Sequence, residues 1–329
     1  MLSVDYIGSK SKLINQIDKA FTDLEITSTM KIGDLFAGSG VVSQYILNKY
    51  KANVITNDFM YYAYLINCGK LTKYTKDEIT IINDKINEYN NLLAIDSFIT
   101  KHFAPPKRKY FTKSNAMKID AIRTKLDIDK QSMSKRIYHC ILASLLSAAD
   151  KVSNTSVVYS AYLKRFKNSA LKPLTLLNID KDNVVQKSAQ VFNQDVFEVI
   201  ENHKFDIVYL DPPYNNRQYE DNYHVLNTIA KYNDFDLHGK TGLSFNIQKS
   251  CFSSKTMVYD CFKTLIDKIN TKHFVISYND EGLLSLKDIR RILALKTFKP
   301  VKVKKIKYKK FKAQEGVTRD YVIEYIIYV

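Results

Sequence analysis

Short hydrophobic runs alternate with segments of helical periodicity over the first 60 residues. Residues 31–36 and 53–57 are typical of strands, whereas 11–21 and 41–50 repeat their apolar positions at helical spacing. Helix, strand, helix and strand in this order predict a mainly parallel sheet covered by helices.

The pattern becomes helical between about residue 72 and residue 149. A helix is predicted over 115–126, where Thr112 or Ser114 can cap the first turn. A basic stretch with two prolines, 105–109, interrupts the helical region. This part of the chain predicts a mostly helical insertion, which we place at residues 71–185.

Strand-like runs return after the insertion. They cover residues 191–192, 205–210, 274–277 and 321–329. A further run, 299–312, alternates eight lysines with apolar residues and predicts a half-buried strand with a basic outer face. The insertion is therefore expected to divide one α/β domain into residues 1–70 and 186–329.

Lysine and arginine outnumber aspartate and glutamate by 50 to 34, which gives a net charge of +16. This excess favours a polyanionic partner, although charge alone is also compatible with a basic protein that has none. The four cysteines, Cys68, Cys140, Cys251 and Cys261, show neither metal-site spacing nor a disulfide framework. No signal-peptide pattern and no run of ~20 apolar residues occurs. We therefore expect a cytoplasmic protein with no membrane segment and no metal.

The tetrapeptide Asp211-Pro212-Pro213-Tyr214 directly follows the strand-like run 205–210. Ligands of open α/β sheets bind at the carboxyl ends of strands, and the two prolines stiffen the loop that begins there. The Asp211 carboxylate and the Pro212 carbonyl could each accept one hydrogen of a planar amino group, which makes its nitrogen more nucleophilic. Tyr214 could stack on the base that carries this group. A plain turn after a strand is the alternative interpretation.

A glycine loop, Ala37-Gly38-Ser39-Gly40, lies between the strand 31–36 and the helix 41–50. Asp58 ends the next strand, where its carboxylate could accept both ribose hydroxyls of a nucleoside. The third glycine of the dinucleotide fingerprint is missing, which disfavours a nicotinamide dehydrogenase. S-adenosylmethionine, which has no phosphate, fits this loop better.

Two further positions have more than one interpretation. Lys10 follows Gly8 and could face a cofactor carboxylate or simply belong to a basic helix start, and the segment lacks the upstream glycine of a phosphate loop. Asp195 could accept from an adenine amino group, cap the helix predicted over 196–202, or do both.

These residues, in this order, resemble the α-group of DPPY-type, N6-adenine-specific DNA methyltransferases. The resemblance spans most of the chain and begins at residues 6–10, which precede the glycine motif as they do in the α-group. It implies a Rossmann-like, seven-stranded methyltransferase sheet whose last strand is antiparallel. It also implies that the mostly helical insertion recognises DNA.

The resemblance implies roles for individual residues. Its catalytic positions are Asp211, Pro212, Pro213 and Tyr214. Its cofactor-binding positions are Tyr6, Lys10, Asp34, Phe36, Ala37, Gly38, Ser39, Gly40, Asp58, Phe59, Asp195, Val196 and Asp211. Basic and aromatic residues in or near the insertion, or just after the catalytic motif, are hypotheses for DNA contact: Lys107, Arg108, Lys109, Tyr162, Lys164, Arg165, Arg217 and Tyr219.

The expected activity is methyl transfer from S-adenosyl-L-methionine to N6 of an adenine flipped out of double-stranded DNA. The enzyme would modify the DNA of a restriction–modification system, with a cognate restriction endonuclease acting independently. The same chemistry would also serve N4 of cytosine or an RNA amine. A catalytically inactive DNA-binding relative is the alternative from another class.

Overall fold

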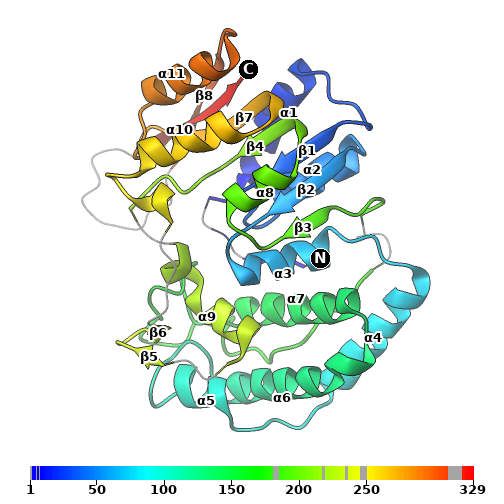
Figure 1. The fold of residues 1–329 in the computed structure, drawn as a ribbon. Coiled ribbons are helices and arrows are strands. Elements are labelled where there is room, and N and C mark those ends of the chain that lie inside the picture. The colour runs from blue at the N-terminus through cyan, green and yellow to red at the C-terminus, as the bar shows by residue number, and fades with distance from the viewer. Residues whose placement is uncertain are drawn as a thin grey trace.

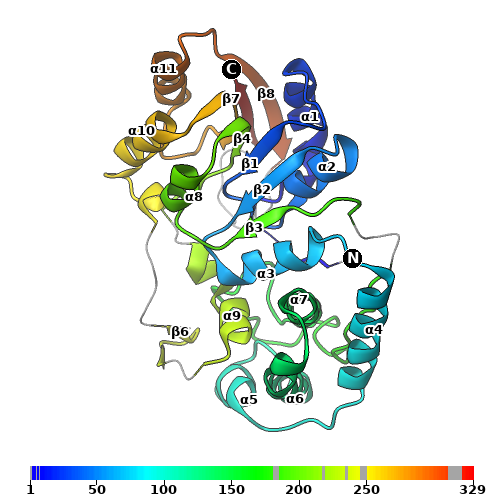
Figure 2. The same cartoon turned by 45° about the vertical axis from the view of Figure 1, so that its right-hand side comes forward.

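A seven-stranded sheet forms one half of the computed structural model, and a layer of helices forms the other half (Figures 1 and 2). The structure describes residues 2–4, 6, 8–180, 185–216, 219–233, 236–244, 250–309 and 321–329. The order of the sheet is β3-β2-β1-β4-β7-β9-β8. Its strands are β1 (Lys31–Asp34), β2 (Asn53–Asn57), β3 (Gln190–Phe192), β4 (Phe205–Leu210), β7 (Thr271–Asn279), β8 (Lys302–Lys309) and β9 (Tyr321–Tyr328).

The sheet is parallel from β3 to β7, and β9 is inserted antiparallel between β7 and β8. This is the arrangement that the resemblance predicted. The strand order changes direction between β1 and β4, so the loops after these two strands open at the point where α/β sheets bind ligands. The glycine loop follows β1, and Asp211 follows β4.

Helices cover both faces of the sheet (Figure 1). Residues of η1 (Lys10–Leu13), α1 (Ile14–Asp23) and α2 (Val41–Lys49) pack on one face. The other face is covered by α8 (Val196–Asn202), α10 (Val258–Lys268) and α11 (Leu286–Thr297), with the short η4 (Cys251–Ser253) beside them. Their apolar side chains are buried against the sheet, which is what holds the two loops in place.

The helical layer lies beyond the β3 edge and has its own hydrophobic core (Figures 1 and 2). At its centre is α7 (Lys135–Lys151), in which every residue from Ile137 to Asp150 is buried. Around it lie α3 (Tyr61–Lys70), α4 (Lys76–Asn90), α5 (Phe98–Phe103), α6 (Lys113–Asp129) with η2 (Lys130–Ser132), α9 (Tyr219–Lys231), and the hairpin of β5 (Leu237–His238) and β6 (Leu243–Ser244).

The layer draws on both sides of the predicted insertion, because α3 precedes residue 71 and α9 follows residue 185. The limits 71–185 remain a prediction. Within the insertion, the helix expected over 115–126 is α6, and the hydroxyl of Thr112 accepts from the N–H of Asn115 at 3.2 Å. The lysine-rich strand is β8, whose apolar side chains are half-buried as expected, while residues 310–312 lie outside the described part.

One expectation about the cysteines was wrong. Cys251 in η4 and Cys261 in α10 form a disulfide, with their Cα atoms 6.3 Å apart. The packing of η4 on the first turns of α10 brings these residues together, and a sequence separation of ten carries no recognisable signal. Cys68 and Cys140 are free cysteines. Among the described residues, no helix is long and apolar enough to span a bilayer.

Candidate active site

A cavity of ≈ 280 Å³ opens between the ends of β1, β2 and β4. Its lining comes from six chain segments that lie far apart in the sequence, and a smaller hollow beside it shares three of the lining residues. The main cavity is lined by Tyr6, Leu35, Phe36, Asn57, Asp58, Phe59, Met60, Asp195, Val196, Phe197, Asp211, Pro213 and residues 250–253. The smaller hollow adds Gly8, Ser9, Lys10, Asp34, Ala37, Ser39, Val41, Val42 and Tyr209.

The glycine loop is held on one side by Asp58. Its two carboxylate oxygens accept from the N–H of Gly38 at 2.7 Å and from the N–H of Met60 at 2.8 Å. Gly38 has a φ of +50°, and a Cβ there would lie 2.7 Å from Cζ of Tyr6. Only glycine fits this position, because the loop passes directly against the Tyr6 ring. Burial raises the pKa of Asp58 to about 6.

Asp34 lies beneath the same loop and is almost fully buried. Its Oδ2 accepts from both the N–H and the hydroxyl of Ser43, at 3.2 and 2.7 Å. Its Oδ1 has no hydrogen-bond partner among the described residues. Burial raises the pKa of Asp34 to about 7, with a further contribution from the nearby charge of Asp211. A buried carboxyl with a vacant acceptor atom suits a cationic or hydrogen-bond-donating ligand group.

Asp211 lies at the end of β4 and is paired with Lys10. The ammonium of Lys10 is 3.0 Å from Oδ1 of Asp211 and donates to the carbonyl of Gly8 at 3.2 Å. Burial raises the pKa of Asp211, and the charge of Lys10 acts against this rise. Glu324 of β9 belongs to the same buried charge cluster, because its charge interacts with those of Lys10 and Asp211.

The segment that follows Asp211 is held in place by its neighbours. Pro212 is buried, whereas Pro213 lines the cavity. The carbonyl of Tyr214 accepts from the N–H of Leu283 at 3.0 Å, and its ring meets Tyr278 edge-on with centroids 6.0 Å apart. The ring of Tyr214 also lies 5.5 Å from the Lys10 ammonium. The loop after β7 therefore supports the loop after β4.

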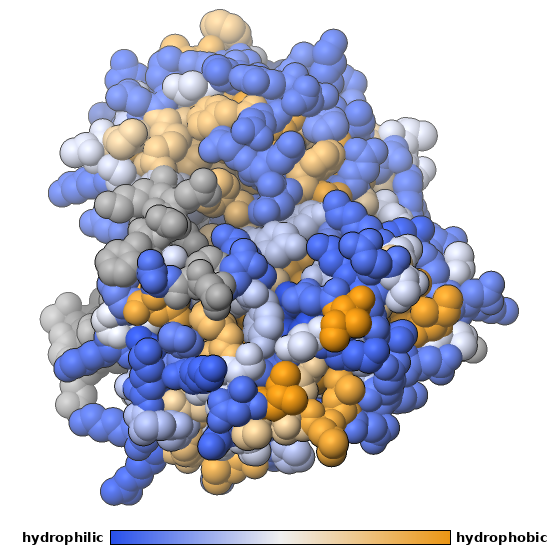
Figure 3. Space-filling model, turned by 60° about the horizontal axis from the view of Figure 1, so that its bottom comes forward, coloured by the Kyte–Doolittle hydropathy of each residue, from blue (hydrophilic) through white to orange (hydrophobic). Residues whose placement is uncertain are grey.

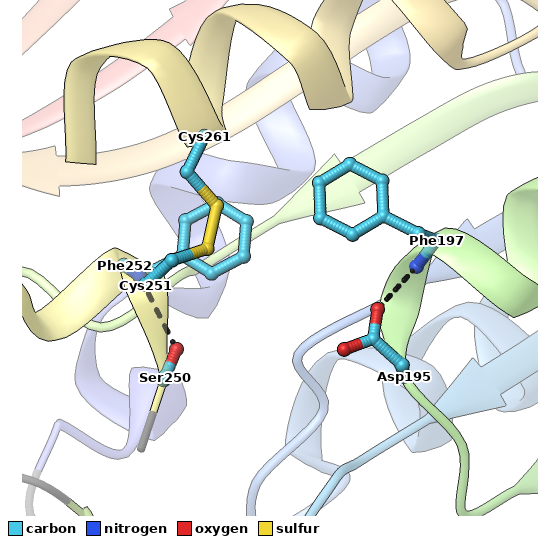
Figure 4. Close-up of a disulfide and its surroundings, with 6 residues drawn as sticks. All are labelled: Asp195, Phe197, Ser250, Cys251, Phe252 and Cys261. Carbon is cyan, nitrogen blue, oxygen red and sulfur yellow. Dashed lines mark hydrogen bonds between the residues drawn. A yellow bond between two sulfur atoms is a disulfide. The ribbon is translucent and has the colours of Figure 1, made fainter. Parts of the chain in front are cut away.

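The far end of the cavity is apolar on two sides (Figure 4). Asp195 caps α8 by accepting from the N–H of Phe197 at 2.8 Å, which confirms the capping interpretation. Across the cavity, Cys251 and Phe252 face the Phe197 ring in Figure 4, and Phe252 meets Phe36 edge-on at 5.1 Å. This end suits a flat heterocycle.

Sequence reasoning missed several lining residues. Phe197 stands two positions after Asp195 and could have been found from its place in the first turn of α8. Phe252 and Ser253 carry no such signal, because η4 reaches the cavity only through its packing on α10. Glu324 was also missed, because it lies within a strand that otherwise follows an apolar pattern.

The sequence model of one protein family, the D12 class N6 adenine-specific DNA methyltransferases, matches residues 6–292 of this chain. The chain belongs to this family. The enzyme class expected from the sequence, a DNA methyltransferase specific for adenine, is thereby confirmed.

Named relatives of this methyltransferase agree with the assignment. It is 36% identical over 332 residues to the type II methyltransferase M.NlaIII of Neisseria lactamica, across 97% of this chain and 95% of the relative. It is 37% identical over 331 residues to M.CviAII of Paramecium bursaria Chlorella virus 1, across 100% and 99%. It is 32% identical over 339 residues to M.FokI of Planomicrobium okeanokoites, across 98% of this chain and 52% of the relative.

The residues expected at the DNA surface of the methyltransferase differ in their placement. Lys107, Lys109, Lys164 and Arg165 are exposed, and Tyr162 is half-buried with its ring 5.0 Å from that of Tyr110. Arg217 lies outside the described residues, and of Tyr219 only its place at the start of α9 is described. In the described part of the chain, no group of three His, Cys, Asp or Glu side chains could hold a metal ion.

Arg108 is placed differently from these exposed residues. Its side chain is 4% exposed, and its guanidinium donates to the carbonyls of His102, Gly239 and Lys240 at 2.7 to 3.1 Å. Each of its three guanidinium nitrogens therefore donates within the protein, and Arg108 connects the β5–β6 hairpin to the end of α5.

Proposed function

We propose that this chain transfers the methyl group of S-adenosyl-L-methionine to N6 of a specific adenine in duplex DNA. The observation that carries the proposal is the position of Asp211. Its carboxylate lines both the main cavity and the hollow at the glycine loop, so a group bound at Asp211 would meet a cofactor held by that loop.

The residues around the cavity fit this cofactor. The positive φ angles of Gly38 and Gly40 allow the loop backbone close to a ligand. Asp58 offers carboxylate acceptors to a ribose, and Asp195, with Val196 and Phe197, would border the adenine ring. The vacant Oδ1 of Asp34 suits the positively charged end. When bound, the cofactor supplies an electrophilic methyl group.

The chain's own residues would prepare the amine. The Asp211 carboxylate and the Pro212 carbonyl accept the two amino hydrogens, which directs the nitrogen lone pair towards the cofactor. Lys10 favours the ionised form of Asp211 and orients its carboxylate. Tyr214 stacks on the base, which offsets part of the cost of flipping it out of the duplex. Correct positioning then accounts for most of the acceleration.

The helical layer is the proposed DNA-recognition region. Lys107, Lys109, Lys164 and Arg165 leave their charges on its surface, where they could neutralise phosphates. The face seen in Figure 3 is mostly hydrophilic, with small separate hydrophobic areas, which suits a wet, charged interface. DNA methylation by this enzyme would protect sites from a cognate restriction endonuclease, which recognises the same sequence independently.

The test is transfer of radiolabelled methyl from S-adenosylmethionine to unmethylated genomic DNA, followed by nuclease digestion and chromatography of the nucleosides. Label in N6-methyladenine supports the proposal. Label in N4-methylcytosine, or in RNA alone, overturns it. The Asp211→Ala variant is the control, because it lacks the proposed acceptor and should transfer label far more slowly.

A further inference from the structure

The last turn of α3 also holds the glycine loop, in addition to Asp58. The side-chain amide of Asn67 donates to the carbonyl of Gly38 at 3.1 Å. The ammonium of Lys70 donates to the carbonyl of Ser39 at 3.0 Å. Both residues are buried, with 0% and 8% of their surface exposed. Two successive carbonyls of the loop are therefore fixed by one helix.

Lys70 makes this contact at a cost to the fold. Burial lowers its pKa to about 8, and no carboxylate of the described residues forms an ion pair with it. A buried ammonium without a counter-charge is unfavourable, whereas an unbranched apolar side chain of similar length would pack there without this penalty. We therefore attribute the lysine at this position to its contact with the loop, which it holds in one conformation, and not to a gain in the stability of the protein.

The same turn of α3 also packs on the centre of the helical layer. A Cβ on Gly69 would lie 2.8 Å from Cβ of Ala143 in α7, so the two helices are in close backbone contact between Asn67 and Lys70. Figures 1 and 2 both show α3 between the sheet and α7. Since a packed contact of this kind transmits a displacement instead of absorbing it, a shift of α7 would move Asn67 and Lys70.

A second set of contacts links α3 to α9, the helix that follows the loop after β4. The ring of Tyr223 in α9 is stacked between Tyr62 of α3, at 5.1 Å, and Tyr6, at 5.3 Å, and Tyr6 lines the cavity. The N–H of Tyr62 donates to Asn227 Oδ1 at 3.0 Å. The helix that holds the glycine loop is thus also fixed to the helix that follows the catalytic motif.

We propose that Asn67 and Lys70 are positioning residues that make the affinity of the cofactor site depend on DNA bound to the helical layer. The inference rests on the proposed function. DNA that displaces α7 would change the position of Gly38 and Ser39 through α3, so DNA and cofactor would alter each other's affinity by the same factor, as linkage requires. We expect a factor of about five or more.

Isothermal titration with S-adenosylhomocysteine, without DNA and with a saturating duplex that contains a methylation site, tests this inference. Lys70→Met removes the donor with little change in shape, and Asn67→Asp does so isosterically. Lys73→Met is the matched control, because Lys73 is exposed just beyond the same helix. Both test variants should bind about 3- to 10-fold more weakly without DNA and should lose the effect of DNA.

The melting temperature separates positioning from a structural role. Lys70→Met should melt at or above the wild-type temperature, because it removes a buried charge, and yet bind the cofactor product more weakly. Variants that keep the full effect of DNA overturn the inference, as do affinity losses that only follow a lowered melting temperature. A wild-type protein that binds neither S-adenosylhomocysteine nor DNA overturns the proposed function as well, so the two failures are distinguishable.

Discussion

The ammonium of Lys10 lies 3.0 Å from the carboxylate of Asp211, and this contact joins η1 to the loop after β4. Lys10 is 5% exposed, so water screens the pair weakly. Lys10 lines the hollow at the glycine loop, and Asp211 lines both this hollow and the main cavity. A change at Lys10 should therefore be measurable in the ionisation of Asp211.

Replacement of Lys10 by Met should shift the pH dependence of catalysis. Burial already raises the pKa of Asp211, and loss of the neighbouring cation removes the interaction that opposes this rise. In the proposed mechanism the ionised carboxylate accepts the amino hydrogen, so the acidic limb of the kcat/KM profile should move to higher pH. Lys12→Met is the control, because Lys12 is exposed in the same short helix. An unshifted limb in the Lys10 variant would contradict the assigned role.

Replacement of Asp211 by Ala should separate binding from turnover. We expect kcat to fall by about 10²–10³-fold or more, as it does when a preorganised polar group is removed from other active sites. The dissociation constant of S-adenosylhomocysteine should change little, because the glycine loop and Asp58 remain intact. Titration calorimetry and single-turnover kinetics measure the two quantities. Equal losses in both would show that Asp211 acts in cofactor binding.

Cofactor affinity should rise with pH through about pH 6. Burial raises the pKa of Asp58 from 3.8 to about 6. Without ligand, the carboxyl of the folded protein therefore stays protonated up to a higher pH than an ordinary aspartate. Binding to ribose hydroxyls requires the ionised form, which predominates only above that pH. The dissociation constant of S-adenosylhomocysteine should therefore fall between pH 5 and pH 7. Asp58→Asn should bind weakly and lose the part of this dependence centred near pH 6, whereas exposed Asp77→Asn should keep it.

Two glycines with similar backbone angles should respond differently to alanine. Gly40 has a φ of +69°, and a Cβ there would lie 1.9 Å from Oδ1 of Asn67. Gly239 has a φ of +66° but nothing within 4 Å. Gly239→Ala should lower the free energy of unfolding by about 1 kcal/mol from strain alone, and Gly40→Ala by about 2 kcal/mol or more. Urea denaturation measures both, and equal effects would refute the tight contact with α3.

The salt dependence of DNA binding should identify the basic surface. Replacing Lys107, Lys109, Lys164 and Arg165 by Gln should reduce the slope of log K against log salt by about 0.9 for each phosphate that the variant no longer neutralises. Lys302, Lys305 and Lys307 are exposed on β8, at the sheet edge farthest from the helical layer, and form the control set. A larger effect from the β8 set would indicate that DNA binds at the opposite end of the molecule.

Local patterns predicted the elements that position the site. The run 205–210 followed by two prolines indicated β4 and its loop, and the spacing from the glycine loop to Asp58 indicated two neighbouring strand ends. Arg108 could not be predicted, because its partners Gly239 and Lys240 are more than 130 residues away in sequence. Phe252 reaches the cavity only by packing of η4, and the stack of Tyr6, Tyr223 and Tyr62 joins three distant segments.

The composition of the helical core limits how specificity can be exchanged between relatives. Side chains of α3 and α9, such as Tyr62 and Tyr223, are buried in the same core as α7 although they lie outside residues 71–185. In a chimera that received only residues 71–185 from a relative, the transferred helices would pack against α3 and α9 of this chain. Neither contact would be matched. Exchange of the recognised DNA sequence between members of this family should therefore require α3, the insertion and α9 to be exchanged together. Such an exchange should be rarer than the exchange of a single insertion.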